Sequence, residues 1–159
     1  MSFNSHDRHC FHLLHIDDEE SDAFFFTRAL KQCSKEVVAH WAQSGQLAVA
    51  YLSNDSNPPP NLIVCDVNMP AMSGFEFLKW LRASRFHRIP VVMLSGSELG
   101  ADVNMAFDLG ANAYVGKPTS SDELLKTMNR IIEFWCEACV LPSITHETAS
   151  LELARIGSA

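Results

Sequence analysis

The sequence lacks the features that would place the chain in a membrane, in a secretory route or on a nucleic acid. No apolar run approaches the ~20 residues that a membrane-spanning helix needs, and the polar stretch from Met1 to Cys10 contains no signal-peptide core. Basic residues are few: the formal net charge is −7, and no basic stripe is available to neutralise a phosphate backbone. We therefore expect a cytoplasmic protein that binds neither membranes nor nucleic acids.

The number of cysteines is odd, which argues against the disulfide framework of a small secreted domain. The five cysteines are scattered along the chain: Cys10, Cys33, Cys65, Cys136 and Cys139. We expect free thiols. Cys136 and Cys139 form a C-x-x-C pair, but the pair lies late in a helical pattern rather than at a strand-to-helix turn, so we interpret it as packing.

The sequence shows no obvious internal repeat, and we expect a single domain. The chain has 159 residues, of which 47% are hydrophobic and 19% charged, and this is ordinary for one globular domain. We expect a flexible segment over residues 1–10, the domain over 11–140, and a tail over 141–159 that holds a short helix or frays.

What the sequence does have is a regular alternation of strand-like and helix-like segments. The expected strands are Phe11–Ile16, Val37–Ala42, Leu62–Cys65, Pro90–Leu94 and Ala113–Val115. The expected helices run from Asp17 to about Cys33, then over Gly45–Leu52, Ser73–Ala83, Glu98–Leu109 and Ser121–Cys139. This alternation predicts an α/β fold with a doubly wound, five-stranded parallel sheet in a single domain.

Polar side chains stand where four of the predicted strands end. Asp17 and Asp18 follow the first strand, Asp66 follows the unbroken apolar run of the third, Ser95 follows the fourth and Lys117 the fifth. Each is unremarkable alone, since acidic residues also begin helices and lysines usually face solvent. In a parallel sheet, however, the carboxyl ends of the strands form one crevice, so we expect these side chains to meet there.

Three carboxylates in one crevice repel one another unless a cation offsets their charge. Oxygen ligands with room for water and phosphate oxygens suit Mg²⁺, with Asp18 and Asp66 as direct ligands and Asp17 direct or through water. A cation also makes phosphoryl transfer to a carboxylate feasible, which indicates Asp66 as the nucleophile. Lys117 and the Ser95 hydroxyl are suited to contact the phosphoryl oxygens.

The chain resembles the receiver domains of response regulators over roughly Phe11 to Val140. The resemblance is carried by Asp17-Asp18, by the stretch Leu62 to Pro70 followed by Ser73-Gly74, by Leu94-Ser95-Gly96, and by Gly110 to Pro118. It implies a flavodoxin-like sheet of the receiver type. Two departures are His15, where an aliphatic residue is usual, and Ser73, where an acidic residue or Asn often precedes the glycine.

The resemblance also implies a role for each matching residue. Asp66 would be the phosphoacceptor, and the magnesium ligands would be Asp17, Asp18, Asp66 and the backbone carbonyl of Asn68. Ser95 and Lys117 would contact the phosphate, Ser95 and Tyr114 would form the switch, and a cis peptide bond would precede Pro118.

Such a protein is not an enzyme beyond its own phosphorylation and dephosphorylation. The expected donor is a sensor histidine kinase or a phosphotransfer protein. The loop with Pro58-Pro59-Pro60 and the ending from Ile132 to Pro142 resemble stand-alone regulators paired with phytochrome-like kinases. Output would pass to a downstream protein, or to a homodimer, through the fourth helix, fifth strand and fifth helix.

Two alternatives remain open from the sequence. A pseudo-receiver would bind partners without being phosphorylated. A flavodoxin-like electron carrier would hold a flavin phosphate at the same strand ends, but it needs a loop rich in Gly, Ser or Thr after the first strand. The acidic run from Asp17 to Glu20 would repel that phosphate.

Overall fold

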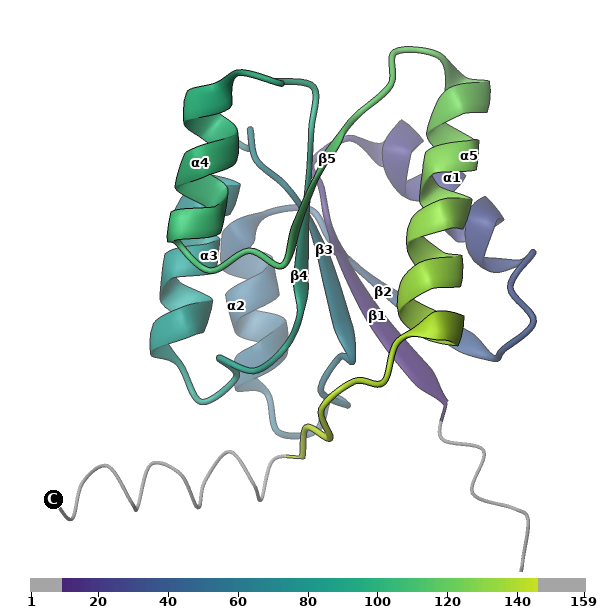
Figure 1. Cartoon of the computed structure of the whole chain (residues 1–159). Helices are drawn as coiled ribbons and strands as arrows, with labels where there is room; N and C mark the ends of the chain where they lie inside the picture. The colour runs from purple at the N-terminus through teal and green to yellow at the C-terminus, as the bar shows by residue number, and fades with distance from the viewer. Residues whose placement is uncertain (1–9, 146–159) are drawn as a thin grey trace, which may run out of the picture.

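Five parallel strands form one sheet at the centre of the molecule (Figure 1). The computed structural model describes residues 10–145, so the expectations for residues 1–9 and 146–159 lie outside the described residues. The strands are β1 (Phe11–Ile16), β2 (Val37–Ala42), β3 (Leu62–Asp66), β4 (Val91–Ser95) and β5 (Ala113–Gly116). Their order across the sheet is β2-β1-β3-β4-β5, which confirms the predicted doubly wound parallel sheet.

Helices cover both faces of this sheet (Figure 1). One face carries α1 (Glu20–Leu30) and α5 (Ser121–Ile132), and the other carries α2 (Gly45–Ser53), α3 (Gly74–Ala83) and α4 (Gly100–Asp108). Each face therefore encloses its own apolar cluster, one against α1 and α5 and one against α2 and α3. This three-layer arrangement leaves the two edge strands, β2 and β5, less covered than the middle of the sheet.

The two strands next to each other in the middle of the sheet, β3 and β4, are buried along their whole length. Leu62, Val64, Val92 and Leu94 pack towards α1 and α5, while Ile63, Cys65, Val91 and Met93 pack towards the other helices. Burial on both faces explains why these strands are unbroken apolar runs rather than alternating ones. It also fixes Asp66 and Ser95, their last residues, at the carboxyl edge of the sheet.

The start of α3 accounts for one departure from the usual receiver sequence. The Ser73 hydroxyl accepts a hydrogen bond from the Glu76 amide at 3.2 Å, and the Glu76 carboxylate accepts one from the Ser73 amide at 2.8 Å. This reciprocal cap satisfies two backbone donors that the first turn of a helix otherwise leaves free. Ser73 therefore has a local structural reason to precede Gly74.

Some helix boundaries differ from the predicted ones. α1 ends at Leu30 rather than near Cys33, and α4 begins at Gly100 rather than Glu98. The segment expected as one helix to Cys139 is α5 followed by a π-helical turn, η1 (Glu133–Ala138). In η1 the Cys139 amide bonds to the Phe134 carbonyl, five residues back. Apolar spacing does not separate such a turn from an α-helix, because the two differ by little over a single turn.

The five cysteines are free thiols, as the sequence predicted. Cys136 belongs to the apolar cluster beneath α1 and α5, where burial raises the pKa of its thiol to about 12. Packing is therefore the role that the structure gives this residue. Among the described residues, no helix has both the length and the apolar character needed to cross a membrane.

Candidate functional site

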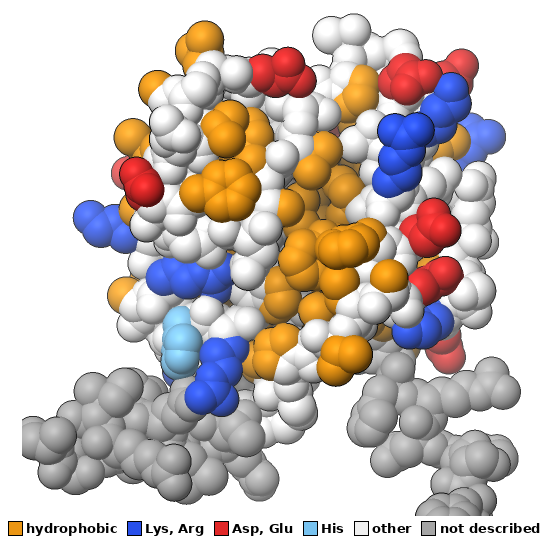
Figure 2. All heavy atoms as spheres, in the orientation of Figure 1, with side chains coloured by type: hydrophobic (Ala, Val, Ile, Leu, Met, Phe, Trp, Pro, Cys, Tyr) orange, Lys and Arg blue, Asp and Glu red, His pale blue; other side chains and the backbone are white. Residues whose placement is uncertain are grey.

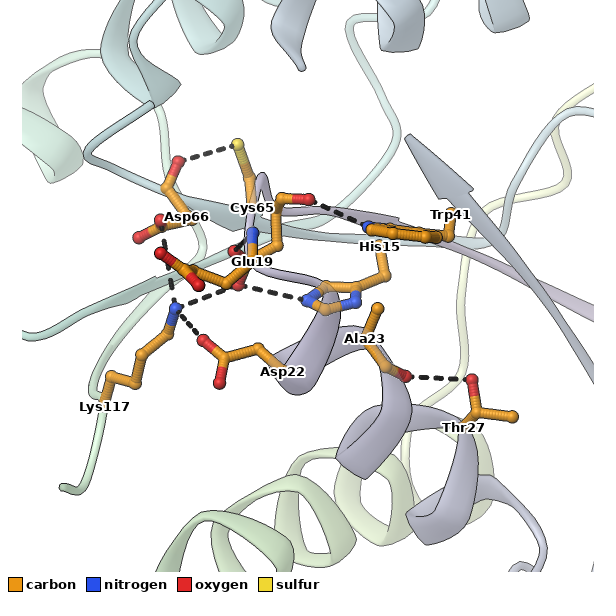
Figure 3. Close-up of polar contacts among 10 residues, drawn as sticks. His15, Glu19, Asp22, Ala23, Thr27, Trp41, Cys65, Asp66 and Lys117 are labelled. Atoms are coloured by element: carbon orange, nitrogen blue, oxygen red, sulfur yellow. Dashed lines mark hydrogen bonds and ion pairs between the residues drawn. The ribbon is translucent and has the colours of Figure 1, made fainter. Parts of the chain in front are cut away.

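The residues predicted for the site converge at the carboxyl edge of the sheet, where Figure 3 shows the Lys117 amine pointing towards Asp66. Asp17 follows β1, Asp66 ends β3, Ser95 ends β4 and Lys117 follows β5. The Lys117 amide donates to the Ser95 carbonyl at 2.7 Å, which ties the end of β5 to the end of β4. Residues up to 100 positions apart in the chain therefore share one crevice.

Three carboxylates gather in this crevice. One oxygen atom from each of Asp17, Asp18 and Asp66 lies within 4.8 Å of the other two. Asp17 is completely buried and Asp66 is 7% exposed, whereas Asp18 faces solvent. Two largely buried carboxylates with a third at the opening make a cluster of hard oxygen ligands that is open on one side. Such a set suits a divalent cation that keeps some of its water.

The environment of Asp66 disfavours its charged form. Burial raises the pKa of the Asp66 carboxyl to about 6, and the charge of Asp17 acts in the same direction. Lys117 and the backbone amides of Asn68 and Val67 oppose this shift without cancelling it. A bound cation would supply the positive charge that this carboxylate lacks, so the residues present fit a metal site.

Asp17 is held in its ionised form. Burial would raise the pKa of its carboxyl, but contacts with His15 and Lys117 and a hydrogen bond from the Glu19 amide outweigh burial and lower it. Oδ2 lies 2.9 Å from Lys117 Nζ and 3.7 Å from His15 Nε2, and Oδ1 accepts from the Glu19 amide at 2.9 Å. At 3.7 Å the His15 contact is electrostatic rather than a hydrogen bond.

Lys117 has three carboxylate neighbours. Its Nζ lies 2.6 Å from Asp22 Oδ2, 2.9 Å from Asp17 Oδ2 and 3.9 Å from Asp66 Oδ2. Burial would lower the pKa of this amine, but the hydrogen bonds to Asp22 and Asp17 outweigh burial and raise it. Lys117 is therefore a fixed positive charge whose nearest partner is a residue that the sequence interpretation did not include.

Asp22 is thus a site residue that the sequence interpretation missed. It stands in the first turn of α1, four residues after Asp18. Asp18 precedes this helix, so helical spacing does not pair the two side chains, and no motif in the sequence distinguishes Asp22 from the acidic residues next to it. A second missed contact is the Trp41 indole, whose N–H donates to the Asp17 carbonyl at 2.8 Å from the neighbouring strand β2. No local pattern predicts that contact.

The two predicted switch residues are connected through Ser97. Ser95 is fully buried, and its hydroxyl oxygen accepts a hydrogen bond from the Ser97 amide at 3.1 Å. The Tyr114 hydroxyl, on β5, donates to the Ser97 carbonyl at 2.6 Å. The same short loop after β4 therefore contacts both side chains.

The expected cis peptide bond before Pro118 is wrong. The bond is trans, as are the other peptide bonds of residues 10–145. The trans form is the lower in energy for most X-Pro bonds. Lys117 reaches Asp17 and Asp22 with the bond in this form, so the lysine contacts do not require the cis isomer.

Comparison with known proteins agrees with this geometry. The family described as the response regulator receiver domain matches residues 13–129. The chain belongs to the response regulator receiver domain family. Response regulator Rcp1 of Synechocystis sp. is 30% identical over 136 residues, which cover 82% of this chain and 92% of Rcp1. The two-component response regulator ORR5 of Oryza sativa subsp. japonica is 30% identical over 122 residues, which cover 76% of this chain and 88% of ORR5.

Solved structures of receiver domains superpose on most of the chain. The phosphorylated cyanobacterial phytochrome response regulator RcpA gives a TM-score of 0.81 at 29% identity, covering 84% of this chain and 99% of RcpA. The Mn²⁺-bound form of Rcp1 gives a TM-score of 0.80 at 30% identity with the same coverage. This receiver domain is accordingly a response regulator of the two-component type, a signalling protein with an acidic pocket at its sheet edge.

Proposed function

We propose that this receiver domain accepts a phosphoryl group on Asp66 from a sensor histidine kinase, in a reaction that depends on Mg²⁺. The observation that carries the proposal is the convergence of Asp17, Asp18 and Asp66 with Lys117 around one crevice. The carboxylates would hold the cation, together with the backbone carbonyl of Asn68. The cation supplies charge neutralisation for the incoming phosphoryl group.

The chain's own residues supply the remaining steps. The ionised Asp66 carboxylate attacks the phosphorus, an oxygen–phosphorus bond forms, and the phosphorus bond to the donor's histidine nitrogen breaks. Lys117 then offers an ammonium group to one phosphoryl oxygen, and the Ser95 hydroxyl donates a hydrogen bond to another. Neither residue has to exchange a proton with the substrate, so each acts as an electrostatic or hydrogen-bonding partner.

The output would follow from movement of the Ser95 hydroxyl towards the phosphoryl group. That movement takes away the acceptor of the Ser97 amide, and the Ser97 carbonyl holds the Tyr114 hydroxyl. Loss of the hydrogen bonds that Ser97 makes to Ser95 and Tyr114 would free the Tyr114 ring to turn inward. That turn would change the surface formed by α4, β5 and α5. The phosphorylated site thereby favours one of two conformations, as a population shift requires.

The α4-β5-α5 surface has the character of a contact surface. Figure 2 shows apolar side chains gathered between α4 and α5 over the edge strand β5. Leu99 is 69% exposed and Phe134 is 55% exposed. An open groove there is lined by Ala113, Val115, Ile131, Phe134 and Trp135, among other residues. We propose that a downstream protein, or a second copy of the chain, binds this surface in the phosphorylated state.

The similarity to RcpA, a cyanobacterial phytochrome response regulator, bears on the identity of the donor. It supports a phytochrome-like kinase as the protein that phosphorylates Asp66. The family match leaves the unphosphorylated pseudo-receiver as the remaining alternative. It would have the same fold and the same contact surface, but no transfer to Asp66.

One experiment separates the two. The purified chain is incubated with a small-molecule phosphodonor such as acetyl phosphate, with Mg²⁺ or with a chelator, and its intact mass is measured. We expect a gain of one phosphoryl group only when Mg²⁺ is present, and no gain for Asp66→Asn. Asp108→Asn, which removes an exposed carboxylate on α4, should behave like the wild type. A wild-type chain that gains no mass in Mg²⁺ would establish the pseudo-receiver.

A further inference from the structure

The amine of Lys117 is held by two carboxylates, and neither is the proposed phosphoacceptor. Figure 3 shows the lysine reaching towards Asp22 on α1 and Asp66 on β3. Its Nζ is 2.6 Å from Asp22 Oδ2 and 2.9 Å from Asp17 Oδ2. The distance to Asp66 Oδ2 is 3.9 Å, which is longer than a hydrogen bond.

The Asp22 contact is shielded from water. The Lys117 side chain is 16% exposed and the Asp22 side chain is 15% exposed. A short ionic hydrogen bond in such surroundings is stronger than an ion pair on an open surface, where hydration and salt weaken the attraction. If Lys117 leaves Asp22 in the phosphorylated state, its new contact with the phosphoryl group has to make up for the favourable free energy of the Asp22 contact.

Asp22 is distinct from the carboxylates that would hold the cation. Asp17, Asp18 and Asp66 have oxygens close to one another, whereas Asp22 is not a member of that group. A cation bound by the three carboxylates would offset their charge but would leave Asp22 facing Lys117. Of the two hydrogen bonds that Lys117 makes to carboxylates, the one to Asp22 is thus the more durable when the site is loaded.

We propose that Asp22 is a positioning residue that competes with the phosphoryl group on Asp66 for the ammonium group of Lys117. In the resting state Asp22 holds the lysine inside the pocket and beyond hydrogen-bonding distance of Asp66. In the phosphorylated state the lysine divides its donors between Asp22 and a phosphoryl oxygen, so Asp22 weakens the hold of the site on that group. The inference rests on the proposed role of Asp66.

The consequence is a specific regulation of the signal. A residue that draws Lys117 away from the phosphoryl group lowers the stability of the active conformation without touching the reacting atoms. To remain active, the receiver then needs either a strong donor, which drives phosphorylation, or a partner on its output surface, which stabilises the phosphorylated state by binding it.

Binding of beryllium fluoride, a non-covalent mimic of the phosphoryl group, tests the proposal at equilibrium. The dissociation constant is measured by calorimetry in Mg²⁺ for the wild type, Asp22→Asn and Asp22→Ser. We expect both variants to bind on the order of tenfold more tightly, the size of one lost competing hydrogen bond to a charged group. Two substitutions keep the test usable if one of them folds poorly.

Two comparisons show whether the effect passes through Lys117. Glu20→Gln removes an exposed charge from the same first turn of α1. The Lys117 ion pairs in the described structure are to Asp17, Asp22 and Asp66 and not to Glu20, so this variant should keep the dissociation constant within about twofold of the wild type. In a Lys117→Gln background, Asp22→Asn should not change the dissociation constant, because the ammonium group for which Asp22 and the phosphoryl mimic compete is gone.

Unchanged or weaker binding by both Asp22 variants would overturn the proposal. Equally tight binding by Glu20→Gln would also overturn it, as would tighter binding by Asp22→Asn in the Lys117→Gln background. Either result would indicate a general effect of charge on beryllium fluoride binding. A wild-type chain that fails to bind beryllium fluoride in Mg²⁺ gives a different result: it overturns the role of Asp66, and the inference falls with it.

Discussion

A Cβ atom at Gly74 would lie 2.2 Å from the backbone carbonyl oxygen of Asp66. It would also lie 2.9 Å from the Val67 Cα, and the Gly74 amide donates to the Val67 carbonyl at 2.8 Å. The first turn of α3 thus packs directly on the backbone that presents the proposed phosphoacceptor. Only a residue without a side chain allows this approach.

Gly74→Ala should therefore destabilise the domain and disturb the site together. The added methyl group meets backbone atoms that cannot rotate away, so α3 has to shift. We expect a loss of about 2–4 kcal/mol in the free energy of unfolding, measured with urea, and slower phosphorylation by a small donor.

Gly100→Ala provides the matched control. Gly100 begins α4, and no atom lies within 4 Å of a Cβ built there. Alanine is a better helix former than glycine, so this variant should be neutral or more stable by about 1 kcal/mol. Equal losses at the two positions would mean that the close approach of Gly74 to Asp66 does not explain the glycine.

The stability of the cation-free domain should depend on pH through Asp66. Its folded-state pKa of about 6 lies above 3.8, the ordinary value for an aspartate side chain. The folded state therefore holds the proton more tightly than the unfolded state, and this contribution to stability is present below about pH 4 and lost as pH rises to about 6. Asp66→Asn has no such loss.

The difference between Asp66→Asn and the wild type should accordingly grow with pH. In a chelator, the variant should be more stable by up to about 3 kcal/mol at pH 7.5 and nearly equal to the wild type at pH 4. Urea unfolding at both pH values measures this, and added Mg²⁺ should narrow the difference at pH 7.5. A difference that stays constant with pH would show that burial does not raise this pKa.

Arg82 should be important for stability although it is remote from the chemistry. Its guanidinium donates to the carbonyls of Gly110, His87 and Ile89 and to the Asn112 side chain, at distances of 2.6 to 3.0 Å. Arg82→Met removes this donor from all four acceptors, of which the Asn112 oxygen keeps the Val91 amide, and we expect a loss of about 2–4 kcal/mol on thermal or urea unfolding.

Lys126→Met is the comparison for Arg82. Lys126 is 60% exposed, and its one ion pair within the described part of the chain is with Glu123, at 2.8 Å, on the surface of α5. Its loss should change the free energy of unfolding by less than about 1 kcal/mol. If both variants lose the same small amount, the Arg82 hydrogen bonds contribute little.

His15 should reduce the stability of the domain. Both of its ring nitrogens are buried without a hydrogen-bond partner among the described residues, and the ring stacks on Phe26 at 4.4 Å. His15→Leu restores an aliphatic residue to β1 and removes two unsatisfied polar atoms. We expect a gain of about 1–2 kcal/mol on urea unfolding, with phosphorylation retained.

A destabilised His15→Leu variant would contradict this expectation. It would show that the attraction between the ring and Asp17, 3.7 Å away, outweighs the burial of its nitrogens. His15→Gln separates the two effects, because a glutamine amide can donate to Asp17 while removing the stacked ring.

Much of the fold follows from the sequence because it depends on local patterns. The run Leu62–Cys65 predicted a strand buried on both faces, and β3 is buried throughout. The alternation of elements predicted the parallel sheet, and with it the common edge where Asp17, Asp66 and Lys117 meet. Boundaries such as the end of α1 and the π-helical turn η1 were missed, since they depend on one or two hydrogen bonds rather than on a period.

The sequence by itself determined which strand-end side chains reach the carboxyl edge, because chain connectivity brings the ends of parallel strands to one edge of the sheet. Only the tertiary structure decided which of them touch. Lys117 lies closer to Asp22 than to Asp66, and the Trp41 indole donates to the Asp17 carbonyl. Such pairings depend on differences of about 1 Å between side chains from separate elements. Those distances are fixed by the packing of α1 and the sheet, and no stretch of sequence encodes them alone.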